Sequence, residues 1–495
     1  MKKYIIKTVK FSFVVLLLTI NSCSEKPGCG YDENKTTVSS CPASPFEGFM
    51  VTTMGGYSLS PTVGVITDTR PNASAPLGQD WNDPILVGAA RVTSIAPAMW
   101  NINDIGQVFG IALDDTKGIF LSATDVYSAT FNPSGVTGTK LGPGGRGGIY
   151  YTDINSPNVT NTLVKTVITA SQNTVGTALI PNSGGVSDLG NSIGNIAFDS
   201  KNQQLFATNL EDGRIYRINP TNGIVLSIFD PFALDNAVAG IAPLTEQLWG
   251  IGVYTDTTNT TTVYFSRTKT ADPLGQSSFG YGTKDIWSVK LDSSGEFVAT
   301  QVGSTKLFND SASSSTLEIL NVPGVRAYVT DIAFSKIGKM LLAERGYAHQ
   351  SKVLEYVKTG ATWSNSSKTF FVGGKSGIFQ IDGENASGGV DYGIRQSNNS
   401  FICDDIVWAT GNFLLPKIKP SNNAYVYSVQ GISANGNTLL PSFPNTFGTG
   451  GGSAPVSGNL PNYSATDIYI HTNINSPANK GSVGDVEVFR SKCCN

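Results

Sequence analysis

Only two histidines, His349 and His471, stand in this chain of 495 residues. A three-histidine zinc site therefore cannot be built within one chain, and a histidine general base has only these two candidates. His349 follows Arg345 on a predicted loop, where binding residues are common. His471 fits a half-buried strand position instead. Neither has a Ser or Asp partner at motif spacing, and no Gly-x-Ser-x-Gly elbow occurs, so nucleophilic hydrolysis lacks its sequence marker.

Cys23 is the residue whose surroundings predict covalent chemistry. A lysine-containing start and an apolar stretch over 11–20 lead to Asn-Ser-Cys, which resembles a bacterial lipobox. We interpret 1–22 as a lipoprotein signal peptide and 23–42 as the lipidated Cys23 with a flexible tether. Ser24 rather than Asp follows the cysteine, and by resemblance to Gram-negative lipoproteins this favours the bacterial outer membrane. Glu25, close behind the cysteine, resembles the surface-export signal of some lineages and implies display at the cell surface, with the periplasmic face as the alternative. Ordinary secretion, with Cys23 as a plain thiol, is the competing interpretation.

Export places the other five cysteines in an oxidising compartment. Cys29 and Cys41 are spaced for a short disulfide loop. Cys403 has a candidate partner at the end of the chain, in either Cys493 or Cys494, and such a bond would fix the C-terminus. Adjacent cysteines do not readily bond to each other, so an odd number leaves one thiol without an assigned partner.

Composition indicates an all-β protein rather than a helical one. Charged residues make up 14% of the chain, and there are 54 glycines. Helices need charged residues on their solvent faces, whereas short strands and turns use Gly, Thr, Ser and Asn. The formal net charge is −3 and becomes more negative when the lysines of 1–22 are removed. A mildly acidic protein is a poor partner for nucleic acid, so we expect none.

An internal repeat organises the rest of the chain. The segment 196–207 aligns without gaps on 332–343, and each combines an apolar strand, a polar turn and a second apolar strand. A third alternating strand then recurs at intervals of 66, 71, 67, 72 and 61 residues. Its expected starts are Ile149, Ile215, Ile286, Val353, Tyr425 and, less clearly, Val486. The expected first strands are 109–114, 195–199, 240–244, 331–335 and 389–393.

Repeated units of three or four short strands predict a six- or seven-bladed β-propeller over 43–495, because a single unit cannot bury both of its faces. Dividing the mature length by the repeat gives about seven units. A pair of all-β sandwiches is the alternative. The strand expected at 484–490 would join an N-terminal strand near 48–53 in one blade, which would close the ring.

Several phrases resemble known propeller families. Residues 209–223 are similar to blades of NHL, SMP-30 and related six-bladed propellers. Residues 106–112, 331–346, 388–393 and 484–489 resemble propeller repeats of largely uncharacterised bacterial surface proteins. The resemblance implies a propeller fold and export. It does not imply an activity, because propellers include both enzymes and passive binding modules.

An SMP-30-like lactonase would hold a divalent cation in the central channel, and its oxygen ligands would suit Ca²⁺ or Mg²⁺. The resemblance implies Asn195, Asp331, Glu344 and Asp405 as candidate ligands near the channel. The family's full metal pattern is not present in order. The alternative is that these side chains cap turns or bind backbone amides between blades.

Two functions follow as hypotheses. The first is a lipid-anchored, non-catalytic binding or assembly module. It would be attached to outer-membrane lipid through Cys23 and would have a protein partner in the membrane or a ligand at the surface. The second is a metal-dependent hydrolase or lactonase with its site in the channel. The scarcity of histidine favours the first, with no certain cofactor, and Ca²⁺ is the cation to test for the second.

Overall fold

The computed structural model describes twenty-one segments of the chain. They are residues 45–55, 62–69, 94–95, 97–114, 116–124, 141–164, 192–210, 212–231, 248–270, 282–298, 305–306, 327–346, 351–360, 362–368, 370, 372, 386–397, 400–414, 426–436, 466–469 and 482–490. The presumed signal peptide and tether lie outside these residues. Within the described residues, no helix is long and apolar enough to cross a membrane.

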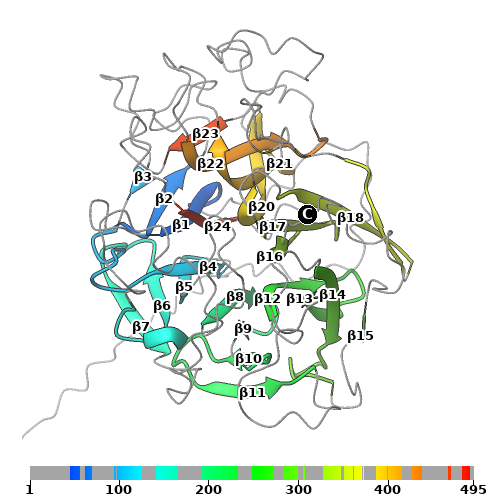
Figure 1. Ribbon diagram of the computed structural model, residues 1–495, viewed down its shortest axis with the longest axis horizontal. Helices are drawn as coiled ribbons and strands as arrows, with labels where there is room; N and C mark the ends of the chain where they lie inside the picture. The colour runs from blue at the N-terminus through cyan, green and yellow to red at the C-terminus, as the bar shows by residue number, and fades with distance from the viewer. Residues whose placement is uncertain are drawn as a thin grey trace, which may run out of the picture.

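The described strands form six four-stranded antiparallel sheets arranged around a central axis (Figure 1). This confirms the predicted β-propeller, and the blade number is six. Blade 1 is β24 (Ser482–Val488), β1 (Phe49–Gly55), β2 (Gly64–Asp68) and β3 (Ser94–Ile95); blade 2 is β4 (Val108–Leu113), β5 (Gly118–Ala123), β6 (Ile149–Asp153) and β7 (Thr160–Val164), with a short 3-10 helix, η2 (Gly145–Gly147), before β6. Blade 3 is β8 (Ile193–Asp199), β9 (Gln204–Asn209), β10 (Ile215–Ile218) and β11 (Val225–Phe229); blade 4 is β12 (Leu248–Thr255), β13 (Thr261–Thr270), β14 (Gly282–Lys290) and β15 (Thr305–Lys306). Blade 5 is β16 (Ala327–Phe334), β17 (Met340–Gly346), β18 (Val353–Thr359) and β19 (Thr362–Asn365); blade 6 is β20 (Ala386–Ser397), β21 (Ser400–Leu414), β22 (Val426–Ser433) and β23 (Thr466–Tyr469).

The ring closes as the sequence predicts, because the last strand is the inner strand of the first blade. Strand β24 pairs with β1 in antiparallel register, with Thr52 opposite Val486. The segment at Val486 is therefore not a third strand, which corrects that interpretation. The N-terminal and C-terminal strands also meet at one end, since Gly48 N donates to Phe489 O at 2.9 Å and Phe489 N donates to Phe49 O at 2.8 Å. Both ends of the described chain therefore lie on the same face of the ring.

Two other details of the repeat differ from the sequence expectation. The inner strand of blade 4 is β12, whereas the expected strand at 240–244 lies outside the described residues. The gapless alignment of blades 3 and 5 is also off by one residue in the second strand. Ile196 pairs with Ala207, but the equivalent Ile332 pairs with Leu342, because the turn of blade 5 is one residue shorter.

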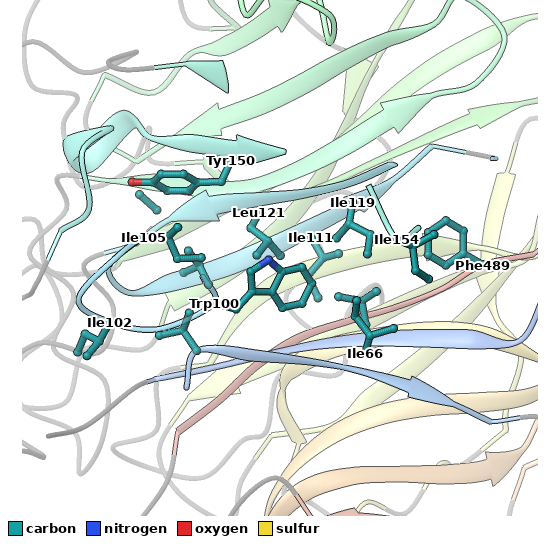
Figure 2. Close-up of a cluster of buried hydrophobic side chains, with 14 residues drawn as sticks. Ile66, Trp100, Ile102, Ile105, Ile111, Ile119, Leu121, Tyr150, Ile154 and Phe489 are labelled. Atoms are coloured by element: carbon teal, nitrogen blue, oxygen red, sulfur yellow. The ribbon is translucent and has the colours of Figure 1, made fainter. Parts of the chain in front are cut away.

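Hydrophobic cores lie between neighbouring blades, and side chains alternate along each inner strand between two such cores. In β4, Ile111 packs into the core shared with blade 1, while Ala112 packs into the core shared with blade 3. Figure 2 shows the first of these cores around the fully buried Trp100, whose Nε1 donates to Thr152 Oγ1 at 3.0 Å. A fully buried Ile or Leu side chain contributes about 1.5–3 kcal/mol, so these cores hold the ring together.

An irregularity interrupts the inner strand of every blade. In each pairing of first and second strands the register shifts, and the inner strand carries the extra residues. Such a bulge redirects side chains and leaves amides without a ladder partner. In blade 3 the freed Asn195 N donates to Thr208 Oγ1 at 3.0 Å, and that hydroxyl donates to Trp249 O of the next blade. Equivalent hydroxyl bridges leave blades 1, 4 and 6 through Thr53, Ser266 and Thr410.

Candidate functional site

A cavity of about 330 Å³ occupies the end of the channel where the first and second strands of each blade are joined, here called the turn end. Inner strands of all six blades line it. At one repeated position of these strands, four blades carry small residues, whereas blades 6 and 1 carry carboxyls. In ring order from blade 2, the residues are Ala112, Ala197, Gly252, Ala333, Asp391 and Glu487. The cavity therefore exists because side chains at this position are small, and its charge comes from two adjacent blades.

Next to the cavity, three polar side chains from alternate blades meet on the axis. We call Asn195, Asp331 and Asp485 the axial cluster. Asn195 Nδ2 donates to Asp331 Oδ1 at 3.3 Å and to the backbone oxygen of Thr330 at 3.0 Å. Side-chain hydrogen bonds also join Asp485 to the other two members. Blades 1, 3 and 5 thus contact one another across the channel, although they are not neighbours in the ring.

The intervening blades carry glycine at the position equivalent to the axial cluster: Gly110 in blade 2, Gly250 in blade 4 and Gly389 in blade 6. The close approach explains this choice. A Cβ on Gly110 would lie 2.2 Å from Asn195 Oδ1, well inside van der Waals contact. Polar residue and glycine therefore alternate around the ring.

Three aspartates of the inner strands each connect two blades by accepting hydrogen bonds from backbone amides. Asp331 Oδ1 accepts from Ile332 N of its own strand at 2.8 Å, and Oδ2 accepts from Val390 N of blade 6 at 2.8 Å. Two other aspartates also accept one amide of their own strand and one of the next blade. Asp391 accepts from Tyr392 N of its own strand and from Val488 N of blade 1. Asp485 accepts from Val486 N of its own strand and from Ile111 N of blade 2. These bonds satisfy amides at the channel edge of the inner strands.

The carboxyls also form two carboxyl–carboxyl pairs. Asp331 is hydrogen-bonded to Asp485, and Asp391 is hydrogen-bonded to Glu487. Burial raises the pKa of Asp485 to about 7. Burial and nearby negative charges hold the pKa values of Asp331 and Glu487 well above their usual range. Each pair therefore shares a proton at a pH where isolated carboxyls are ionised.

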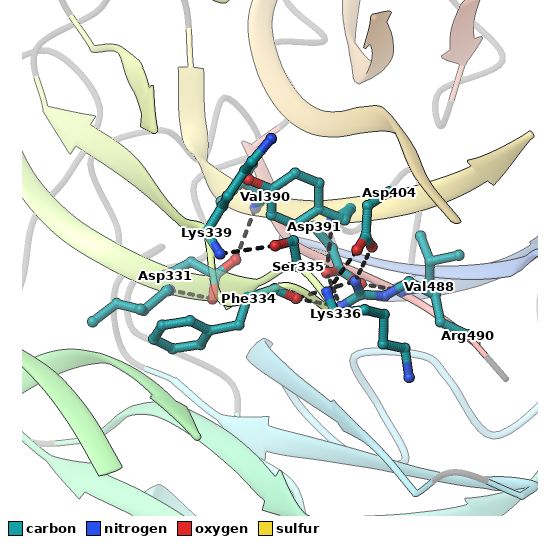
Figure 3. A network of polar contacts seen from close by, with 12 residues as sticks. Asp331, Phe334, Ser335, Lys336, Lys339, Val390, Asp391, Asp404, Val488 and Arg490 are labelled. Carbon is teal, nitrogen blue, oxygen red and sulfur yellow. Dashed lines mark hydrogen bonds and ion pairs between the residues drawn. The ribbon is translucent and has the colours of Figure 1, made fainter. Parts of the chain in front are cut away.

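Arg490 balances part of this charge at the rim of the cavity (Figure 3). Its Nη2 lies 2.8 Å from Asp391 Oδ1, and its Nη1 lies 2.8 Å from Asp404 Oδ1. Both nitrogens also donate to Phe334 O at 3.1 Å. Burial lowers the pKa of Arg490, but the charges of Asp391 and Asp404 outweigh it and hold that pKa above its ordinary value. The guanidinium is thus fixed by blades 5 and 6.

Among the predicted site residues that the structure describes, it brings Asn195 and Asp331 together. Glu344 and Arg345 lie at the opposite end of the channel. Glu344 Oε2 accepts from Lys352 N at 3.0 Å, in the backbone connection to the third strand. Arg345 Nη1 donates to the backbone oxygens of Ser387 and Val483, and so bridges three blades.

Asp405 does not line the cavity, but the neighbouring Asp404 is paired with Arg490, which does line it. A positive φ of 55° at Asp404 redirects the chain there. His349, His471, Cys23, Cys29, Cys41 and Cys493 lie outside the described residues. Cys403 is disulfide-bonded, and its partner also lies outside them. The predicted Cys403 pairing with the C-terminus therefore stays a prediction.

Asp391, Asp485, Glu487 and Arg490 are functional candidates that the sequence analysis missed. Three of them stand inside phrases already singled out as propeller repeats. The signal that could have found them is a polar residue inside an otherwise apolar inner strand, recurring at one repeat position. A charged residue is costly to bury without a partner, so such a position indicates a polar channel.

The residues that would hold a metal ion are Asp331, Asp485 and Glu487, whose carboxylate oxygens lie within 4.8 Å of one another. Oxygen ligands at this spacing suit Ca²⁺ or Mg²⁺. Asp331 and Asp485 already accept two backbone amides each, which leaves fewer lone pairs for an ion. Two of the four expected ligands, Glu344 and Asp405, are not part of this group.

The other end of the channel, here called the aromatic end, is filled. Phe109, Leu210, Trp249 and Tyr328 form a buried cluster from four blades. The ring centroids of Phe109 and Trp249 lie 5.8 Å apart, and those of Trp249 and Tyr328 lie 5.7 Å apart. Arg345 lies over the Phe109 ring at 5.6 Å. Trp249 is thus buried in a cluster to which four blades contribute.

Comparisons with known proteins give structural likeness at low identity. No protein-family model matches the sequence, and no curated protein matches it. A chain of the nidogen/laminin complex matches with a TM-score of 0.39 and 9% identity, over 90% of this chain and 99% of that one. The β-propeller domain of Swd1 from Myceliophteria thermophila gives 0.30 and 10%, over 73% and 79%. An endo-arabinase from Bacteroides thetaiotaomicron gives 0.30 and 11%, over 66% and 93%. The assignment of six blades rests on the sheet topology itself.

Proposed function

We propose that this protein is a lipid-anchored propeller of the bacterial outer membrane, displayed at the cell surface, that binds a ligand or partner in the cavity at the turn end. The lipobox-like segment ending at Cys23 supports the anchor. The closed ring supports a rigid module, since joining the first and last strands in one sheet leaves no open edge at the seam.

The observation that carries the proposal is the cavity and its place in the ring. Asp331, Asp391 and Asp485 fasten blades together, so a structural role accounts for them. The half-buried Glu487 and the small residues of blades 2 to 5 remain for a ligand. The chain also enters and leaves the ring at the turn end, so a tether would emerge beside the cavity.

Changing the acylated residue and the cavity separately tests this proposal. Cys23→Ser should abolish labelling by radioactive palmitate and move the protein out of the outer-membrane fraction. Surface display should make the wild type sensitive to protease added to intact cells. Cross-linking in cells should capture a partner with wild type but not with Glu487→Lys. Palmitate labelling that persists in Cys23→Ser, or capture that is indifferent to the cavity variant, would refute the corresponding part.

A metal-dependent hydrolase is the second candidate, favoured by the spacing of Asp331, Asp485 and Glu487. Elemental analysis of the purified protein and lactone or ester hydrolysis before and after chelation test it. The hydrolase is favoured over the binding module if the protein contains stoichiometric Ca²⁺ and if removal of this ion abolishes hydrolysis without unfolding the protein. A metal-free protein without hydrolysis in added Ca²⁺ would eliminate it.

A further inference from the structure

We propose that the turn-end cavity takes a small organic cation, with a primary ammonium group bound at Glu487. This inference rests on the proposed binding function and names the chemical class of the ligand. Carboxylates are the usual partners of ammonium groups, and pairs of this kind make strong charge-assisted hydrogen bonds. Four features of the cavity support the assignment: its charge, a carboxyl whose described partner is a second carboxyl and not an amide, its size and its walls.

The charged groups that face the cavity are predominantly acidic. Asp114, Asp199, Asp391 and Glu487 line it, against Lys336 and Arg490. The two aspartates of the axial cluster lie directly behind. Arg490 is held by two carboxylates and a backbone oxygen, so its charge is committed to blades 5 and 6. The region beside Glu487 therefore has an excess of negative charge, which favours a cation.

Glu487 is the carboxyl best able to meet a ligand. Asp391 accepts two backbone amides and is paired with Arg490, and Asp114 accepts the amides of Thr116 and Lys117 in its turn. Within the described contacts, Glu487 has another carboxyl, Asp391, as its partner instead of an amide. It is half-buried and lines the cavity. An ammonium group could therefore donate hydrogen bonds to its oxygens.

Size and lining separate an organic cation from a bare metal ion. A volume of about 330 Å³ is at the lower end of the range for small-molecule sites and far exceeds one ion. Phe198, Tyr254 and Phe334 contribute to the walls, and the rings of Tyr254 and Phe334 are stacked at 5.2 Å. Aromatic rings attract cations and also cover an aliphatic chain. An alkyl-ammonium ligand can place its charge beside the carboxyls and its alkyl chain against the aromatic rings.

Calorimetric titration of the purified full chain with 1,5-diaminopentane is the direct test, with 1,5-pentanediol as the neutral probe. We expect saturable binding of the diamine and none of the diol. Glu487→Gln should weaken diamine binding at least tenfold, and Glu487→Asp should lie between. Glu296→Gln is the matched control, because Glu296 pairs with Arg217 outside the cavity and should leave binding unchanged.

The outcomes separate the inference from the proposed function. Equal binding of diol and diamine, or undiminished binding in a folded Glu487→Gln, overturns the inference. Saturable binding of CaCl₂ without diamine binding overturns it in favour of the metal site. If Glu487→Gln does not fold, Asp391→Asn serves as the second variant, with the same weakening expected. If the wild type does not bind the diamine but still captures a partner in cells, only the inference is overturned. If the wild type captures no partner in cells, the proposed function is overturned.

Discussion

The two ends of the channel are built from the same six inner strands, yet one end is filled and the other is hollow. At the aromatic end, the buried side chains of Phe109, Trp249 and Tyr328 pack against one another. At the turn end, four blades present Ala or Gly at the repeat position, and blades 6 and 1 present Asp391 and Glu487. Side-chain volume at single strand positions, rather than the course of the backbone, therefore decides where a propeller of this kind has room for a ligand.

The charge at the hollow end is also distributed unevenly around the ring. Carboxyl–amide contacts connect blades 5, 6, 1 and 2, the region where the last strand closes the ring. Hydroxyl bridges connect blades 3, 4 and 5, and they also connect blades 6, 1 and 2 beside the carboxyl contacts. Blade 5 has Ala343 where blade 3 has Thr208, and Arg345 reaches from the same strand to blades 6 and 1. Carboxyl contacts are thus added to the hydroxyl bridges in the part of the ring where the last strand closes it.

Removing the largest side chain of the aromatic end should have the largest effect. Trp249→Ala should lower the free energy of unfolding by about 4 kcal/mol, because it leaves a cavity among tightly packed rings. Glu487→Gln at the turn end should change it by less than about 1 kcal/mol, since that side chain borders an existing cavity. Urea unfolding followed by circular dichroism measures both. Similar losses in the two variants would contradict the contrast between the ends.

Arg490→Ala should follow, with a loss of about 3 kcal/mol. It leaves the buried Asp391 without its cation, and breaking one partner of a buried pair exposes the full desolvation penalty of the other. The same urea experiment applies. Arg490→Lys keeps the charge but not the bidentate geometry and should recover part of the loss. A neutral effect of Arg490→Ala would mean that Asp391 is protonated in the folded state without help from the guanidinium.

Gly110→Ala should cost about 2 kcal/mol, because its new Cβ would overlap Asn195 Oδ1. The cost should be smaller in the Asn195→Ala background, where that oxygen is absent. A double-mutant cycle by thermal or urea unfolding gives the coupling between the two sites. If the changes in the free energy of unfolding simply add, a steric conflict does not explain the alternation of glycine and polar residues.

The smallest effect concerns pH. Because the folded pKa of Asp485 is raised to about 7, the folded state binds more protons than the unfolded chain above pH 4. This contribution is complete below the ordinary pKa of an aspartate and is lost as the pH rises through the folded value, so the free energy of unfolding should fall between pH 5 and 8. Urea midpoints over that window measure the slope.

Asp485→Asn should flatten this slope, whereas Asp292→Asn should not. The hydrogen bonds of Asp292 with Ser294 and Glu296 hold its pKa below the ordinary value, so it stays ionised throughout the window. A wild-type slope of opposite sign would show that the axial carboxyls are ionised in the folded protein.

Much of the fold was predictable because strand alternation and repeat spacing are local properties. The third strands at Ile149, Ile215 and Val353 and the closing strand at 484–490 are where the sequence indicates. Dividing the length of the mature chain by the repeat length did not give the number of blades, because the connections between strands differ in length. A better signal was present: Gly and Asn or Asp alternate at 110, 195, 250, 331, 389 and 485, and such alternation closes only on an even ring.

The site was less predictable because proximity in a ring is not proximity in sequence. Asn195 and Asp331 were recognised by their repeat position, but their contact with Asp485 requires ring closure. Glu344 and Asp405 have suitable chemistry, but they lie on second strands and do not line the cavity. Asp404 and Arg490 meet across blades 6 and 1, and no local pattern predicts that pair.

By itself, the sequence determined strand periodicity, the repeat and the choice of small or polar residues at inner-strand positions, since each is a property of neighbouring residues. Only the tertiary structure decided that the small residues surround one cavity, that the polar residues share protons on the axis and that large residues fill the opposite end. The physical reason is that a channel is made jointly by six blades, so burial, charge and free volume there depend on residues hundreds of positions apart.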